Sequence, residues 1–159
     1  LFVQEELEYD SPIPNRCGRC HACLDACPTS SIINNQSSII SNQSSFISSR
    51  CLSYLTIEHR GPIPHSSLDS HSSFFILHSS FKNIYGCDIC QLACPWNRFA
   101  VPTTEPAFQP GGALLTMTKE KWHNLTEEQY RILFKGSAVK RAKYAGLMRN
   151  INNQQSIKS

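Results

Sequence analysis

The chain has 159 residues, of which 40% are apolar and 17% are charged, a composition typical of a globular protein with little apolar sequence for a core. It holds no apolar run of about 20 residues and no charged-then-apolar leader, so the sequence indicates neither a membrane span nor secretion. We therefore expect a cytoplasmic protein without membrane contact, whose eight cysteines are metal or cluster ligands rather than disulfides.

The formal net charge of +3 is unevenly distributed along the chain. Residues 1–118 hold nine Asp and Glu against six Lys and Arg, whereas residues 119–159 hold three against nine. From Arg131 onward there are seven basic residues and no acidic one, a pattern that suits a polyanionic partner. A solvated helix face explains the same pattern equally well.

The first cysteine motif follows a polar stretch, residues 1–16, which starts without Met and which we expect to be an extended lead-in from an upstream domain. Cys17, Cys20 and Cys23 are spaced C-x2-C-x2-C, and Cys27 follows after three residues with Pro28 directly behind it. This C-x2-C-x2-C-x3-C-P run is typical of bacterial two-cluster ferredoxins, in which the fourth cysteine ligates the other cluster.

The other four cysteines complete a second set of ligands. The run GCDICQLACPWN at residues 86–97 lacks one cysteine of the full motif, and the isolated Cys51 supplies the missing thiolate. Eight thiolates in two sets of four match two [4Fe–4S] clusters. The exchange of the fourth cysteine predicts cluster 1 at Cys17, Cys20, Cys23 and Cys94, and cluster 2 at Cys27, Cys51, Cys87 and Cys90. Four-cysteine zinc sites are the competing interpretation, because they also use paired C-x2-C units.

Two low-complexity stretches separate these ligands. Residues 32–49 repeat the unit QSS, and residues 65–83 repeat HSS at His65, His71 and His78. Their Ser, Asn and Gln content offers little to a packed core, so we expect loop expansions that metal-pinned ends can tolerate. We attribute the three histidines to copying of the repeat rather than to a metal site.

A stretch punctuated by Pro and Gly, residues 104–112, leads into three predicted helices. Their start signals are Thr118, Thr126 with Gln129 as a capping box, and Ser137. The third helix is expected to bury a stripe of Val139, Ala142, Gly146, Met148 and Ile151. The predicted core residues of this tail are Leu114, Leu115, Trp122, Leu125, Leu133 and Phe134.

Five stretches together resemble the C-terminal iron–sulfur portion of the epoxyqueuosine reductase family. They are LEYDSPIPNRCGRCHACLDACPTSSI, RCLSYLTIE, YGCDICQLACPWN, TEPAFQP and FKGSAVKRAKYAGLMRN, and they span nearly the whole chain outside the repeats. The reductive dehalogenases share the cofactor plan of this family, but SYLTIE and GSAVKRAKYAGL favour the tRNA enzyme. Ser30 and Ser31 depart from the small Gly-Ala type pair that is usual in the family.

The resemblance implies a reductase in which two [4Fe–4S] clusters feed a cobalamin that removes the epoxide oxygen of epoxyqueuosine in tRNA. Cobalamin would be shared with an upstream catalytic domain, and its implied contacts beside cluster 2 are Ser53, Tyr54 and Asp88. Helix capping is the open alternative for Ser53 and for Asp88. The other implied partners are a reduced flavodoxin- or ferredoxin-type electron donor and a tRNA anticodon stem-loop, the latter bound by Lys140, Arg141, Lys143 and Arg149.

We expect an α+β, helix-rich fold: a bacterial-ferredoxin-like double [4Fe–4S] domain at residues 17–100, with short helices after Cys20 and Cys90. Residues 101–159 are predicted to form a Pro/Gly linker and a small basic helical tail. The favoured function is the electron-transfer portion of a monomeric epoxyqueuosine reductase, inactive as a reductase on its own. The alternative is a stand-alone two-cluster ferredoxin-like carrier, which would need no basic tail.

Overall fold

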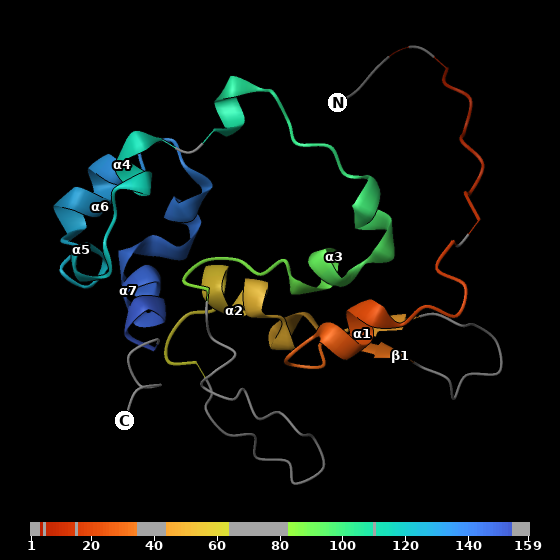
Figure 1. Cartoon of the computed structure of the whole chain (residues 1–159), viewed down its shortest axis with the longest axis horizontal. Helices are drawn as coiled ribbons and strands as arrows, with labels where there is room; N and C mark the ends of the chain where they lie inside the picture. The colour runs from red at the N-terminus through yellow and green to blue at the C-terminus, as the bar shows by residue number, and fades with distance from the viewer. Residues whose placement is uncertain are drawn as a thin grey trace, which may run out of the picture.

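The computed structural model describes residues 4, 6–14, 16–34, 44–63, 83–109 and 111–153. Over these residues the chain is helix-rich and has one two-stranded sheet, which confirms the helix-rich class (Figure 1). Most of the two predicted loop expansions, at residues 35–43 and 64–82, lies outside the described residues. None of the helices in these ranges is long and apolar enough to span a bilayer.

Two short helices carry the cysteine motifs, and they lie side by side (Figure 1). Helix α1 spans Ala22–Ala26 and helix α3 spans Ile89–Ala93. The residues that flank the two helices have matching backbone angles. Before the helices, φ and ψ are −128° and 17° at His21 and −120° and 16° at Asp88. After them, φ and ψ are −71° and 111° at Cys27 and −69° and 122° at Cys94. Each helix is thus a copy of one local structure, ended by a Cys-Pro pair whose proline disfavours a further helical turn.

The predicted position of the second of these helices was wrong by a few residues. Helix α1 follows Cys20 as expected, whereas α3 begins before Cys90 and carries it. The matching backbones explain this difference, since α3 repeats α1 and α1 carries Cys23 one residue after its start.

The first predicted loop expansion is closed by a hairpin rather than being loop throughout. Strand β1, Ile32–Asn34, pairs antiparallel with β2, Ser44–Phe46, with Ile32 opposite Phe46. The N–H of Ile47 donates to the carbonyl of Ser31 at 2.8 Å and extends the ladder. Main-chain pairing satisfies backbone groups whatever the side chains, so a polar insert can still begin and end as strands.

The middle of the chain contributes a small apolar cluster beside the ligands. The 3-10 turn η1, Ser48–Arg50, leads through Cys51 into helix α2, Leu52–Ile57. Leu52 and Leu55 pack with Ile63, and Cys87 packs against these three residues. The residue that caps α2 is Cys51, so Ser53 lies inside the first turn and the capping role considered for it was wrong.

After α3 the chain leaves the ligand region. The turn η3, Pro95–Phe99, and the turn η4, Pro106–Phe108, are joined by an extended stretch that arches away from the body of the molecule before reaching the tail (Figure 1). Its large apolar side chains Phe99, Val101 and Phe108 are exposed.

The tail forms a small helical unit with its own core. Its helices are α4 (Gly112–Leu115), α5 (Lys119–His123), α6 (Glu127–Leu133), the 3-10 helix η5 (Ala138–Ala142) and α7 (Lys143–Asn153). The hydroxyls of Thr118, Thr126 and Ser137 accept the N-terminal amides of their helices, and Thr126 with Gln129 forms the predicted capping box. All three start signals are therefore confirmed.

The third predicted helix is divided in two at Lys143. Its φ of 60° and ψ of 164° place Lys143 in a conformation that residues other than Gly rarely adopt, and η5 ends there. The break changes the phase of the buried stripe, so α7 buries Leu147, Asn150 and Ile151, of which only Ile151 had been predicted.

The core of the tail is close to the predicted one, with one error. Its buried residues are Leu125, Tyr130, Phe134, Leu147 and Ile151. Leu114, Trp122 and Leu133 are partly buried against this cluster, but Leu115 is 72% exposed. Helix α4 is a single turn, so it can turn only one of its two leucines inward.

Candidate metal centre

Cys27 ends helix α1 and lies among polar groups that point at its sulfur. The N–H of Ser31 donates to Cys27 Sγ at 3.3 Å, and the Ser31 and Thr29 hydroxyls lie 3.1 and 3.6 Å from it. Burial alone would raise the pKa of the Cys27 thiol, but these hydrogen bonds outweigh it and lower the pKa to about 7. The site at Cys27 thus favours the thiolate, which is the form that binds metal.

Cys87 lies at a junction of thiols from three segments of the chain. Burial raises the pKa of the Cys87 thiol, a backbone hydrogen bond from Ile89 opposes this rise, and the charges of Cys51, Cys90 and Cys27 raise it further. The thiols of Cys51, Cys90 and Cys27 thus lie within electrostatic reach of Cys87, and Cys27 comes from the first motif. Negative thiolates gathered in this way need a cation to offset their repulsion.

The residues assigned to cluster 1 come from the turn before α1, from α1 itself and from the end of α3. Cys17 and Cys20 form an exposed turn, closed by the Cys20 N–H bond to the Cys17 carbonyl at 2.9 Å. Gly18 occupies this turn at a φ of 56°, where Gly is unstrained. Cys23 lies on α1 and Cys94 caps the neighbouring α3, and both are partly buried.

The spacing of the thiols differs from that of a single-ion site. Within the described ranges, no three His, Cys, Asp or Glu side chains are grouped closely enough to hold one metal ion. The thiolates of a [4Fe–4S] cluster bind four different irons and stand farther apart than the ligands of one ion. The eight cysteines lie on or next to α1, α2 and α3, a distribution compatible with two clusters.

The residues predicted to contact cobalamin are accessible. Ser53 and Tyr54 lie on the first turn of α2 after Cys51, and Tyr54 is 36% exposed. Asp88 occupies the N-cap position of α3, as the capping alternative predicted, but its carboxylate makes no capping hydrogen bond. The exposed Asp88 follows the cluster ligand Cys87 directly.

The four residues predicted to bind tRNA differ in exposure and in hydrogen-bond partners. Lys140, Arg141 and Lys143 are exposed at the break between η5 and α7, and Arg141 forms an ion pair with Glu58 just after α2. Arg149 is turned inward instead. Its guanidinium donates to three backbone carbonyls, those of Leu55, His59 and Gly61, and twice to the Asn150 side chain. These bonds use all five of its N–H donors, so the expectation that Arg149 binds phosphate is corrected.

Sequence reasoning missed three buried polar residues near the ligands. Thr29 and Ser31 are 3% and 2% exposed, and a polar pair just after a Cys-Pro ligand was the available signal. Asn150, at 0% exposed, had no such signal, because its partners lie far away in the sequence.

Comparison with known proteins places this geometry in a family. The family of 4Fe-4S double cluster binding domains matches residues 16–97, which is just over half of the chain and holds all eight cysteines. The chain belongs to this family. The zinc interpretation is therefore dropped, and two [4Fe–4S] clusters are the expected cofactors of this double cluster domain.

Several relatives of this chain are epoxyqueuosine reductases. The epoxyqueuosine reductase of Cellulophaga algicola is 41% identical over 152 residues, which are 96% of this chain and 44% of the relative. The solved structure of the Streptococcus thermophilus epoxyqueuosine reductase has a TM-score of 0.68 at 27% identity, and the match covers 96% of this chain and 35% of that one. The resemblance noted in the sequence is thus confirmed, and the chain spans less than half the length of these relatives.

A third similar protein was solved with a tRNA stem loop. A crystal structure of epoxyqueuosine reductase with an epoxyqueuosine-modified tRNA stem loop shares the fold at a TM-score of 0.62 and 22% identity, covering 94% of this chain and 35% of that chain. At this identity the likeness concerns the fold.

Proposed function

We propose that this chain is the electron-transfer portion of a cobalamin-dependent reductase that converts epoxyqueuosine to queuosine in tRNA. The observation that carries the proposal is the crossing of the two motifs: Cys27 belongs to the first motif, but its charge acts on Cys87 together with the charges of Cys51 and Cys90. This crossing supports a bacterial-ferredoxin-like exchange of the fourth cysteine. The ligands would be Cys17, Cys20, Cys23 and Cys94 for cluster 1, and Cys27, Cys51, Cys87 and Cys90 for cluster 2.

The role of the chain is to hold the two clusters close together and to tune them. Bound [4Fe–4S] clusters supply one-electron transfer. Contact between α1 and α3 fixes the distance between the two ligand sets. Once Cys27 binds iron, its sulfur can only accept hydrogen bonds, so Ser31 donates from both its N–H and its hydroxyl. Such bonds stabilise the more negative reduced state of the cluster.

Metal loading tests the ligand assignment. Anaerobic reconstitution should give about eight irons per chain, two full cubanes. Substitution of Cys94 by Ser should then leave Cys27, Cys51, Cys87 and Cys90 protected from alkylation and expose Cys17, Cys20 and Cys23. Exposure of Cys87 and Cys90 instead would show that each motif binds its own cluster and would overturn the exchange.

A chimaera tests the reductase function against the alternative of a stand-alone carrier. The chain would be joined to the upstream part of the Cellulophaga algicola relative and assayed on an epoxyqueuosine-containing tRNA hairpin. We expect conversion to queuosine, and none when Cys27 is replaced by Ser. A chimaera that loads all its iron but converts nothing would favour the stand-alone carrier.

Cobalamin would be held by the upstream domain against Ser53, Tyr54 and Asp88, which are accessible beside the cluster 2 ligands. In that position the Asp88 carboxylate, which caps nothing, is available to the cofactor. Replacing Asp88 by Ala in the chimaera should lower turnover more than iron content. Equal losses in both would indicate a purely structural residue.

Lys140, Arg141 and Lys143 would bind the phosphates of a tRNA anticodon stem-loop, as their exposure and the absence of acid in η5 and α7 support. Their joint replacement by Gln should weaken tRNA binding and flatten its salt dependence by about one counterion per lost contact. Replacement of the exposed Lys119, at the start of α5, is the control. An unchanged salt slope in the triple variant would remove these residues from the RNA interface.

Electron entry is proposed on the side of cluster 1, where Cys17 and Cys20 are exposed. The donor would be a reduced flavodoxin- or ferredoxin-type protein, and the reductase would act as a cytoplasmic monomer. Sedimentation of the reconstituted chain as a dimer would contradict the last point.

A further inference from the structure

The C-terminal helix α7 is joined to the cluster region through two consecutive residues, Arg149 and Asn150. Asn150 is 0% exposed, and its Nδ2 donates to the carbonyl of Thr56 at 2.8 Å and to that of Ile84 at 2.9 Å. Its Oδ1 accepts from Arg149 Nε at 3.1 Å and from Nη2 at 2.9 Å. One buried amide thus links three segments that are far apart in the sequence.

Arg149 holds the chain that leaves α2. Its Nη2 donates to the Leu55 carbonyl at 2.7 Å, and its Nη1 donates to the carbonyls of His59 and Gly61 at 2.9 and 2.8 Å. The last carbonyls of a helix have no partners within it, so this guanidinium supplies donors that α2 lacks. Burial lowers the pKa of Arg149, with a smaller contribution from the nearby Arg60, but the side chain stays charged.

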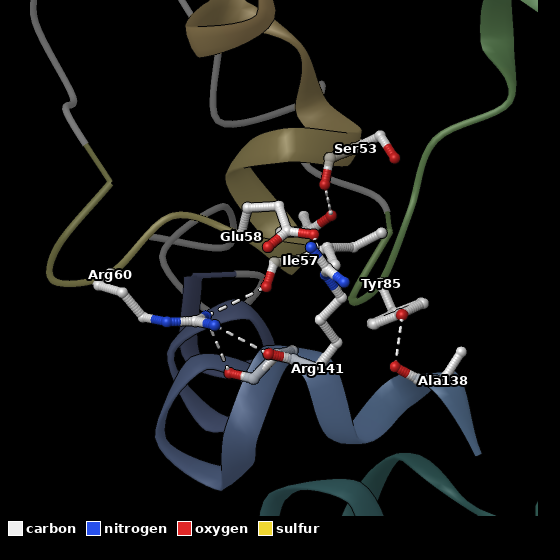
Figure 2. A network of polar contacts seen from close by, with 9 residues as sticks. Ser53, Ile57, Glu58, Arg60, Tyr85, Ala138 and Arg141 are labelled. Carbon is white, nitrogen blue, oxygen red and sulfur yellow. Dashed lines mark hydrogen bonds and ion pairs between the residues drawn. The ribbon is translucent and has the colours of Figure 1, made fainter.

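The segment 84–86 forms its own hydrogen bonds to η5 and to α2. Tyr85 donates its hydroxyl to the Ala138 carbonyl at 2.8 Å, as Figure 2 shows. The N–H of Gly86 donates to Thr56 Oγ1 at 3.0 Å, and the Thr56 hydroxyl itself donates to the Leu52 carbonyl at 2.7 Å. Figure 2 also shows Arg60 reaching the backbone of η5, where it binds the Arg141 carbonyl at 2.9 Å.

Helix α2 and the segment 84–86 are each next to a proposed ligand of cluster 2. Cys51 immediately precedes α2, and Cys87 immediately follows Gly86. The distance between Cys51 and Cys87 therefore depends on how α2 lies against Ile84–Gly86, and the Asn150 amide and the Thr56 hydroxyl set that arrangement. Cys17, Cys20, Cys23 and Cys94 belong to elements with no hydrogen bond to Arg149 or Asn150 among those the structure describes.

We propose that Asn150, with Arg149, is a positioning residue for cluster 2, so that the helical tail is part of the cluster-binding structure. The inference rests on the proposed pair of clusters. Loss of the Asn150 donors would leave two buried carbonyls unpaired and let Cys51 and Cys87 separate, while cluster 1 keeps its ligands.

The decisive variant is Asn150→Asp, which keeps the size of the side chain and its acceptor for Arg149 but removes both donors. Asn152→Asp, on the exposed side of the same helix, is the matched control. After anaerobic reconstitution we expect about four irons per chain in Asn150→Asp and about eight in the parent and the control. Alkylation should label Cys27, Cys51, Cys87 and Cys90 in Asn150→Asp alone.

A second variant avoids the tail altogether. Thr56→Val removes the hydroxyl that accepts the Gly86 N–H without changing any residue of α7, and it should reproduce the selective loss of cluster 2, whereas Thr56→Ser should restore it. Equal loss of both clusters in Asn150→Asp and Thr56→Val, or eight irons in both, would overturn the inference while leaving the proposed function intact. A parent chain that binds no iron would overturn both.

Discussion

The cluster region and the tail of this chain are stabilised in different ways. In the described part of the cluster region, only Leu52, Leu55 and Ile63 form a buried apolar cluster, and α1 and α3 bury no residue. In the described part of the tail, five buried residues form one core with seven partly buried neighbours, and Ile84 of the cluster region packs against it. We therefore expect the cluster region to depend on bound metal, because ligand binding can supply the free energy of folding that so few buried apolar side chains do not.

The two regions also differ in how their helices begin. Helices α5 and α6 start at threonines whose hydroxyls bind the backbone, whereas α1 and α3 have no capping side chain. The starts of α5 and α6 are therefore specified by residues within the tail itself. Helices α1 and α3 each end at a cysteine that is followed by proline. The two regions should therefore respond differently to the same perturbation.

Removal of iron should separate the two regions most strongly. After complete anaerobic chelation we expect the amides of α2 to exchange with deuterium as in an unfolded chain, since the cluster that would join Cys51, at the start of α2, to the other ligands is then gone. The amides of α6 should stay protected by the tail core. Hydrogen exchange with mass spectrometry measures both, and unchanged protection of α2 in iron-free protein would show that the cluster region does not need its metal.

Truncation of Phe134 should have the opposite selectivity. Phe134 is 2% exposed and stacks on Trp122 with ring centroids 6.3 Å apart, so Phe134→Ala should lower the stability of the tail by about 3–5 kcal/mol. Urea unfolding followed by Trp122 fluorescence, in a Trp96→Phe background, measures the change. The control is Ile132→Ala on the same helix, where the side chain is 71% exposed and a change below about 0.5 kcal/mol is expected. Similar losses in both variants would refute a distinct tail core.

Removal of the capping box should cost less. Thr126 Oγ1 accepts the Gln129 N–H at 3.2 Å and Gln129 Oε1 accepts the Thr126 N–H at 2.9 Å, so Thr126→Ala should destabilise the tail by about 1 kcal/mol. Thr126→Ser keeps the hydroxyl and should lose much less. If Ser and Ala variants melt alike in the same urea assay, the cap does not contribute.

The ion pair between Glu58 and Arg141, which joins the two regions, should have the smallest effect. Arg141 is 69% exposed in its side chain, and solvent and salt screen such pairs. A double-mutant cycle with Glu58→Gln and Arg141→Gln should give a small coupling at low salt that vanishes at about 1 M salt, where the Debye length is about 3 Å. A coupling that persists at high salt would mean that the two side chains interact by packing.

Much of the ligand region could be predicted because its information is local. The C-x2-C spacing, the prolines after Cys27 and Cys94 and the lone Cys51 predict two clusters and an exchange of ligands between them without any structure. The three helix starts at Thr118, Thr126 and Ser137 were likewise readable, since a capping hydroxyl needs only the next few residues.

The tertiary structure alone decided where α7 points. The break at Lys143 changes which residues of the following helix face the core, and no residue type in that stretch predicts a positive φ. Arg149 then turns inward because the Leu55 carbonyl near the end of α2, 94 residues earlier, needs a donor from outside its helix. Asn150 is buried for the same reason. Local sequence specifies caps, turns and ligand spacing, whereas the partner of a buried polar group is fixed only when distant segments pack together.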